Sequence, residues 1–265
     1  MKLIDLTRTL DPADRDRIAQ QTARPDLHAP RMRYLRPDGE GIDEFCRCLK
    51  CEPNELLDHE GWGEEIIDDM SSHCGTHVDS PLHSGTTSEG KPSRTIDQID
   101  LGELYCPGYV LDLRASARRG EAISVAALDT AITHAGGKLS DGCAVLIRTG
   151  TEDDRPGDAN YFNYPGMTRE GTLHLIERGA KVLGTDANGW DRPFAVMTRQ
   201  FRSDAIPLWD GHKAIREREA FIVQKLTNLR ALPLNGFHVG FFPLKLARAS
   251  AAPARVVAFV DDATG

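Results

Sequence analysis

Residues 73–83 read HCGTHVDSPLH and place three histidines and one aspartate within eleven positions. These side chains, His73, His77, Asp79 and His83, all occupy odd positions. Side chains alternate between the two faces of an extended strand, so all four would point the same way. A helix would place His73 and His77 on one side and the other two roughly opposite. The spacing therefore predicts extended backbone with nitrogen and oxygen donors gathered on one face.

A straight strand cannot bring the first two histidines to one ion. His73 and His77 would lie about 13 Å apart at roughly 3.3 Å per residue, whereas each nitrogen ligand of a metal lies about 2.1 Å from it. Gly75 lies between them and tolerates backbone conformations that other residues avoid. We therefore expect a bend at Gly75, while Thr76 and Pro81 disfavour a helix.

The donor set suits a catalytic metal site. Zinc or manganese accepts two imidazoles and a carboxylate, and three protein ligands leave positions open for water or substrate. The alternatives are a structural zinc closed by four ligands, or histidines paired with surface carboxylates. Structural zinc usually recruits cysteine, and Cys74 would point to the face opposite the odd-numbered residues.

Composition bounds the class of protein. The chain has 265 residues and is 40% hydrophobic, so we expect one domain over residues 1–265. Because its net charge is −8, we expect no nucleic acid or anionic membrane as partner. It contains no apolar run of about 18 residues, the length that a membrane-spanning helix needs. The first twelve residues, MKLIDLTRTLDP, lack the apolar stretch of a signal peptide, so we expect a cytoplasmic protein that acts on a small molecule.

Strand and helix patterns alternate along the chain, which predicts an α/β fold with a mixed β-sheet core and flanking helices. Residues 13–60 are rich in charge, proline and glycine and predict a surface excursion or lid. Ser124 and Thr168 are candidate N-caps for helices over 124–137 and 168–180. Strands are predicted in the segments 2–10, 64–72, 109–114, 143–150, 181–186, 221–229, 237–246 and 254–261.

The stretch 73–83 matches H-x-G-T-H-x-D-x-P-x-H at every fixed position and so resembles the signature of the metal-dependent cyclase family, which includes bacterial kynurenine formamidases and isatin hydrolases. The segments LIDLTRTL (3–10), GTDANGWDRP (184–193), GHKAIREREAFIVQKLTNLRALP (211–233) and FHVGFFPLKL (237–246) resemble other parts of that family. The resemblance implies a swivelling β/β/α fold, homodimers or homotetramers, and hydrolysis of an amide or ester by metal-activated water. It also implies His73, His77 and Asp79 as metal ligands.

Gln224 departs from the family pattern. In two-metal members the last motif histidine, a later histidine and a glutamate help to hold a second ion, and the matching positions here are His83, His212 and Gln224. Glutamine offers only a neutral carbonyl oxygen and two N–H donors, which hard divalent cations bind poorly. We therefore predict one ion per chain, Mn²⁺ with Zn²⁺ as the alternative. His83 and His212 would be free for catalytic proton transfer, and Gln224 would orient substrate or water, or bind the ion weakly.

One ion, as in the isatin hydrolases, predicts hydrolysis of a cyclic amide C–N bond, with isatin opened to isatinate. Aromatic residues should then line the pocket, and Trp62 and Trp190 are candidate substrate-binding residues, with plain packing as their alternative. Asp186 and Asp191 could bind substrate, orient a ligand histidine or simply stabilise a turn.

Three functions remain open. The first is a manganese-dependent hydrolase of isatin or a related aryl lactam. The second is a zinc arylformamidase acting on N-formylkynurenine, or a lactone hydrolase. The third is a non-catalytic metal-binding or assembly protein. Gln224 favours the first over the second, while the complete His/His/Asp set and His83 count against the third.

Overall fold

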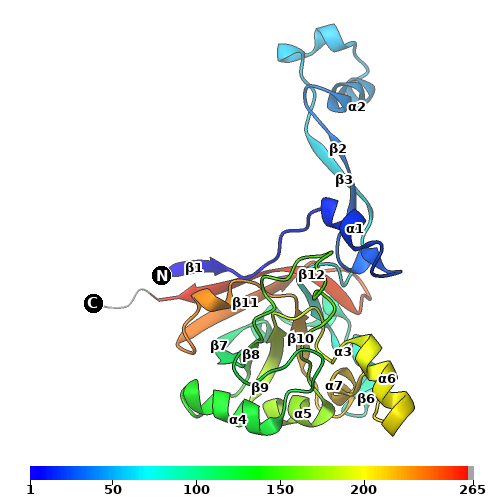
Figure 1. Cartoon of the computed structure of the whole chain (residues 1–265). Helices are drawn as coiled ribbons and strands as arrows, with labels where there is room; N and C mark the ends of the chain where they lie inside the picture. Colours follow the sequence, from blue (N-terminus) through cyan, green and yellow to red (C-terminus); the bar gives the residue numbers. More distant parts are fainter. Residues whose placement is uncertain (262–265) are drawn as a thin grey trace. The chain divides into compact units, whose positions relative to one another are not determined.

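The computed structural model of the chain describes residues 1–261 (Figure 1). Two compact units divide it: the barrel unit, made of Met1–Thr9 and residues 72–261, and the insert unit, Leu10–Ser71. The insert unit contains the predicted excursion 13–60 and extends beyond it at both ends. The prediction of one domain over the whole chain stays a prediction. Within residues 1–261, no helix is both long enough and apolar enough to cross a bilayer.

The barrel unit is built on one mixed β-sheet. Its strand order is β1-β12-β11-β7-β8-β9-β10-β4, and an additional β12–β4 pairing closes all of these strands except β1 into a barrel. Neighbouring strands from β7 to β10 run parallel, and the other pairs are antiparallel. The strands are β1 (Lys2–Asp5), β4 (His77–Asp79), β7 (Tyr105–Asp112), β8 (Cys143–Arg148), β9 (Ala180–Thr185), β10 (Phe221–Gln224), β11 (Phe237–Pro243) and β12 (Ala251–Val260). The predicted α/β class with a mixed sheet is confirmed.

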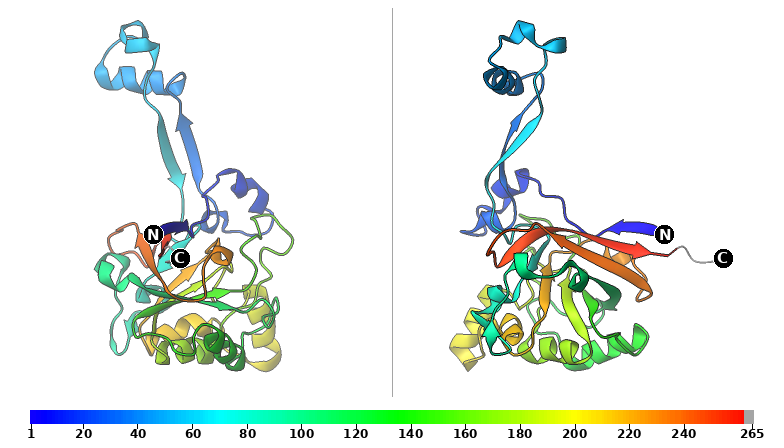
Figure 2. Two further views of the ribbon diagram at one scale, coloured as in Figure 1. Left: turned by 90° about the vertical axis from the view of Figure 1, so that its left-hand side faces the viewer. Right: turned by 180° about the vertical axis from the view of Figure 1, so that it is seen from behind.

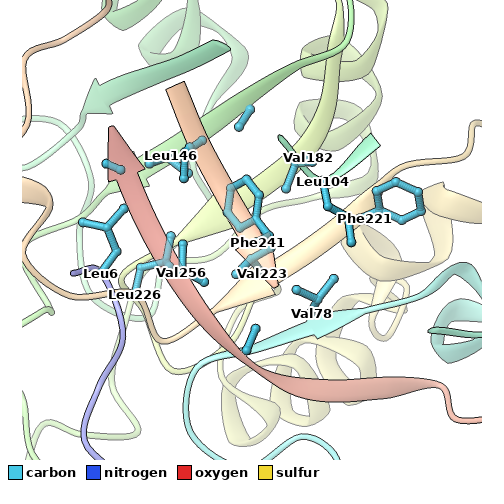
Figure 3. Close-up of a cluster of buried hydrophobic side chains, with 14 of the residues drawn as sticks. Leu6, Val78, Leu104, Leu146, Val182, Phe221, Val223, Leu226, Phe241 and Val256 are labelled. Carbon is cyan, nitrogen blue, oxygen red and sulfur yellow. The ribbon is translucent and has the colours of Figure 1, made fainter. Parts of the chain in front are cut away.

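Alternating side chains on the strands separate two apolar layers. In β8, Leu146 joins a cluster inside the barrel, and Figure 3 shows it near Val182 and Phe241. Val145 and Ile147, its neighbours along the strand, belong instead to the cluster between the sheet and the helices. A strand buried on both faces has a continuous apolar sequence, and residues 143–147 of this strand are all apolar and buried.

Two helices cover the outer layer, as Figures 1 and 2 show in green and yellow-green. They are α4 (Val125–His134) and α5 (Arg169–Glu177). The Ser124 and Thr168 side chains accept hydrogen bonds from the backbone N–H groups three residues on, so both predicted N-caps are confirmed. The other helical segments of this unit are α3 (Pro81–Ser84), α6 (Phe194–Asp204), α7 (Asp210–Lys213), η4 (Ile96–Gln98), η5 (Leu101–Glu103), η6 (Ala214–Arg216) and η7 (Leu229–Ala231); β5 (Thr87–Ser88) and β6 (Lys91–Pro92) form a short hairpin.

The insert unit contains a two-stranded antiparallel ribbon, β2 with β3, whose strands are joined by a helical segment. Within it, the rings of Phe45 and Trp62 lie 4.9 Å apart. Trp62 therefore packs against its own unit, and its predicted role in substrate binding stays a prediction. The elements are α1 (Ala13–Ile18), η1 (Pro25–Leu27), β2 (Arg31–Leu35), α2 (Glu40–Leu49), η2 (Pro53–Glu55), η3 (Leu57–His59) and β3 (Glu64–Asp69).

Candidate active site

Strand pairing places three candidate residues on one face of the barrel. β4 and β10 are antiparallel, with Gln224 opposite His77 and Val223 opposite Val78. Both valines belong to the cluster inside the barrel. Since side chains alternate along a strand, His77, Asp79 and Gln224 all point outward, away from that cluster.

The chain bends before β4, as predicted. Gly75 has a φ of +61°, in the left-handed region that glycine adopts at little cost. The bend returns His73 to the strand, where its Nδ1 lies 2.8 Å from Asp79 Oδ1. The prediction of extended backbone is wrong beyond the strand, because Pro81 begins a helical turn, α3. Proline is favoured at a first helical position, since a backbone N–H there would have no partner within the helix. That turn carries His83, whose ring centroid lies 4.1 Å from that of His73.

One oxygen of Asp79 marks the centre of the candidate metal site. Asp79 Oδ1 is buried and makes no hydrogen bond, yet it lies 2.8 Å from His73 Nδ1 and 3.3 Å from His77 Nε2. Ligand atoms that share one ion at about 2.1 Å lie about 3.0–3.4 Å apart. His77 Nδ1 lies 2.8 Å from the Gly75 carbonyl oxygen, to which it can donate, and Nε2 is then left with a lone pair for the ion. The residues therefore fit a divalent cation.

His83 also reaches this site. Ligand atoms of His73, Asp79 and His83 all lie within 4.8 Å of one another, a group that does not include His77, so His83 is a candidate third ligand beside His73 and Asp79. Burial opposes the charge of Asp79, but the nearby His83 and His77 outweigh it and hold the pKa of the carboxyl well below its usual range. Burial lowers the pKa of His77, and that of His83 to about 4. These shifts favour the neutral imidazoles that metal ligation or base catalysis requires.

His212 is held at the site by Asp191. The carboxylate accepts hydrogen bonds from Gly211 N at 2.7 Å, from His212 N at 3.0 Å and from His212 Nδ1. Nε2 is left facing the site, 3.7 Å from Asp79 Oδ2. Burial opposes protonation of His212, but the Asp191 carboxylate outweighs it and raises the pKa of His212 to about 9. Of the roles considered for Asp191, the geometry supports orienting a histidine.

Gln224 is hydrogen-bonded to Asp79. Its Nε2 donates to Asp79 Oδ2 at 2.8 Å and lies 3.3 Å from His212 Nε2. A carboxylate can only accept hydrogen bonds, so the amide nitrogen must face Asp79. Glutamate at position 224 would set two carboxylates side by side, an arrangement that favours a proton or a second cation between them.

Comparisons with known proteins identify the family of this chain. Residues 4–192 match the family model for cyclases, described as "Putative cyclase". The chain belongs to the cyclase family. It is 28% identical over 211 residues to isatin hydrolase of Roseibium aggregatum, a match that covers 73% of this chain and 74% of that protein. It is 27% identical over 192 residues to kynurenine formamidase of Salinibacter ruber, covering 71% of this chain and 76% of that protein.

The same fold occurs in isatin hydrolase A from Labrenzia aggregata bound to benzyl benzoate. The TM-score is 0.71 at 23% identity, covering 98% of this chain and 94% of that chain. The predicted family resemblance and fold are thus confirmed. Isatin hydrolase and kynurenine formamidase both act by hydrolysis, which supports the broader prediction of a cyclase-family hydrolase.

The two tryptophans nearest the candidate site in sequence, Trp190 and Trp209, lie in different surroundings. Trp190 is 1% exposed in the outer apolar layer, where its Nε1 donates to Thr172 Oγ1, so the structure gives no support to its predicted role in substrate binding. Trp209, which was not among the predicted site residues, stacks on His212 instead. Its place three residues before His212 was the available signal, since residues so spaced share a side of a helical turn.

The Asp186 carboxylate accepts hydrogen bonds from the backbone N–H groups of residues 149 and 150 and stabilises the turn that these two residues form.

Proposed function

We propose that this chain is a metal-dependent hydrolase of a cyclic amide, with isatin, opened to isatinate, as the first substrate to test. The observation that carries the proposal is the buried Asp79 Oδ1, which makes no hydrogen bond and lies beside the nitrogens of His73 and His77. Isatin hydrolase among its relatives supports the substrate class.

Each residue of the site has a role in this proposal. His73, His77 and Asp79 would hold the ion, which supplies a Lewis acid that polarises a carbonyl and lowers the pKa of water. His212 presents Nε2 to the same space, and the His83 ring lies 5.4 Å from that of His212. The two imidazoles are placed to take a proton from the attacking water and to deliver one to the leaving nitrogen.

We further propose one ion per chain, manganese with zinc as the alternative. The hydrogen bond from Gln224 Nε2 to Asp79 Oδ2 supports this number, because it occupies the carboxylate oxygen that could otherwise bind a second ion. Imidazole and carboxylate ligands are compatible with either metal.

Changing Gln224 to glutamate should raise the metal content from one ion per chain to two. The new carboxylate, beside Asp79 and within reach of His212, would supply the charge that a second divalent ion requires. Metal per protein can be measured by inductively coupled plasma mass spectrometry after loading and gel filtration. Gln20→Glu, an exposed change of the same charge in the insert unit, is the control. An unchanged single ion in Gln224→Glu would contradict the explanation of the stoichiometry.

The manganese-loaded enzyme should have a higher kcat/KM for isatin than for N-formylkynurenine. Isatin opening is followed by loss of visible absorbance and formamide cleavage by release of formate. A preference for the formamide would instead support the arylformamidase, which the kynurenine formamidase relative keeps as the second candidate. No turnover of these substrates or of small lactones at saturating metal would favour the non-catalytic alternative.

A further inference from the structure

Trp209 occupies a backbone position that does not suit tryptophan. Its φ of 58° and ψ of 36° lie in the left-handed region, which residues other than glycine, asparagine and aspartate seldom adopt. It is also the N-cap of α7, yet its side chain makes no capping hydrogen bond. Asparagine would satisfy both requirements, since it tolerates this conformation and is among the best N-caps. Residues held in such conformations cluster at functional sites, which directs attention to what the indole touches.

The indole lies between the two segments that carry the proposed proton-transfer residues. It stacks on His212 with a centroid distance of 4.5 Å and an angle of 24°, and it meets the His83 ring at 5.0 Å and 88°. The Lys213 ammonium lies 5.0 Å from the same ring and donates to the Ser84 carbonyl oxygen at 2.9 Å, which ties α7 to α3. Trp209 is thus the aromatic partner that His83 and His212 share.

We propose that Trp209 is a positioning residue that fixes the orientation of these two imidazoles relative to each other. Asp191 fixes one atom of the His212 ring, Nδ1, and leaves the tilt of the ring to the side chains that contact its faces. The indole stacks on one face of His212, and its edge contact with His83 sets the second ring against the first. The inference rests on the proposed function, because the assigned role of both imidazoles is proton transfer.

Two substitutions separate positioning from folding. Trp209→Asn should keep the turn and the N-cap, so the melting temperature should equal or exceed that of the wild type and the metal content should be unchanged. Its kcat should fall roughly tenfold to hundredfold, with KM little changed, because misoriented reacting groups cost about this much. Trp209→Phe retains a ring and should recover part of the loss. Leu208→Ala, a change at the exposed neighbouring residue, should behave as the wild type.

Histidine ring signals test the same inference without activity. In zinc-loaded protein with ¹³C-labelled histidine, the signals of His83 and His212, assigned with His83→Gln and His212→Gln, should be shifted by the ring current of Trp209. In Trp209→Asn they should lose this shift and broaden as the rings move. Unchanged signals, a full kcat, or a melting temperature that falls in both variants with no rescue by phenylalanine would overturn the proposal. If the wild type hydrolyses no tested substrate while the signals respond as expected, the proposed function fails and the positioning role stands.

Discussion

Replacing His77 with alanine should abolish ion binding and hydrolysis together. His77 Nε2 lies 3.3 Å from Asp79 Oδ1, and the His77 side chain is 2% exposed, so water cannot readily replace the lost ligand. The variant would leave His73 and Asp79 as the remaining predicted ligands, fewer than the three that catalytic sites of this kind commonly use. An ion that binds the folded state also stabilises it, by about 4 kcal/mol at 1,000 times its dissociation constant.

Metal analysis and thermal unfolding measured together check this result. Wild-type protein should lose melting temperature when a chelator is added, whereas His77→Ala should melt at one temperature with or without it. His134→Ala, at an exposed histidine near the C-terminal end of α4, controls for the loss of an imidazole. If His77→Ala still binds one ion tightly, His77 is not an essential ligand, and the third ligand is His83, which lies within reach of His73 and Asp79.

The local features of this site could be predicted from the sequence because they depend on near neighbours. Period-two spacing placed His77 and Asp79 on one face, and Gly75 marked the bend. The error at His83 is also local: proline disfavours the interior of a helix but is favoured at its first position, and Pro81 begins α3 here.

Long-range geometry could not be predicted in the same way. The register that sets Gln224 opposite His77 joins strands far apart in the sequence, and alternation within one strand does not specify it. Trp190 and Trp209 each lie close in sequence to a site residue, yet only the latter contacts the histidines. Which of the two indoles faces the histidines is decided by how the turns pack, and the three-residue spacing of Trp209 before His212 is only a partial signal of it.

Asparagine in place of Asp191 should lower kcat by about 10²- to 10⁴-fold with the ion still bound. The Asp191 carboxylate accepts from two backbone N–H groups and from His212 Nδ1 at once. Asparagine has one carbonyl oxygen, so either the backbone groups lose a partner or the amide NH₂ faces Nδ1. In the second case His212 loses the carboxylate that raises its pKa to about 9, so the imidazole no longer holds the proton that it is placed to deliver to the leaving nitrogen.

Some loss of stability should accompany this change, since an unsatisfied buried group costs about 1–3 kcal/mol. Kinetics should therefore be measured well below the melting temperature, with the metal content determined on the same samples. The matched control is Asp129→Asn, which alters another aspartate–histidine pair, with His174 Nε2 at 2.9 Å from Asp129 Oδ1, on helices α4 and α5. That control should keep wild-type kcat, because the pair lies outside the site. If Asp191→Asn stays within about threefold of the wild type, His212 does not transfer the proton, and the role passes to His83.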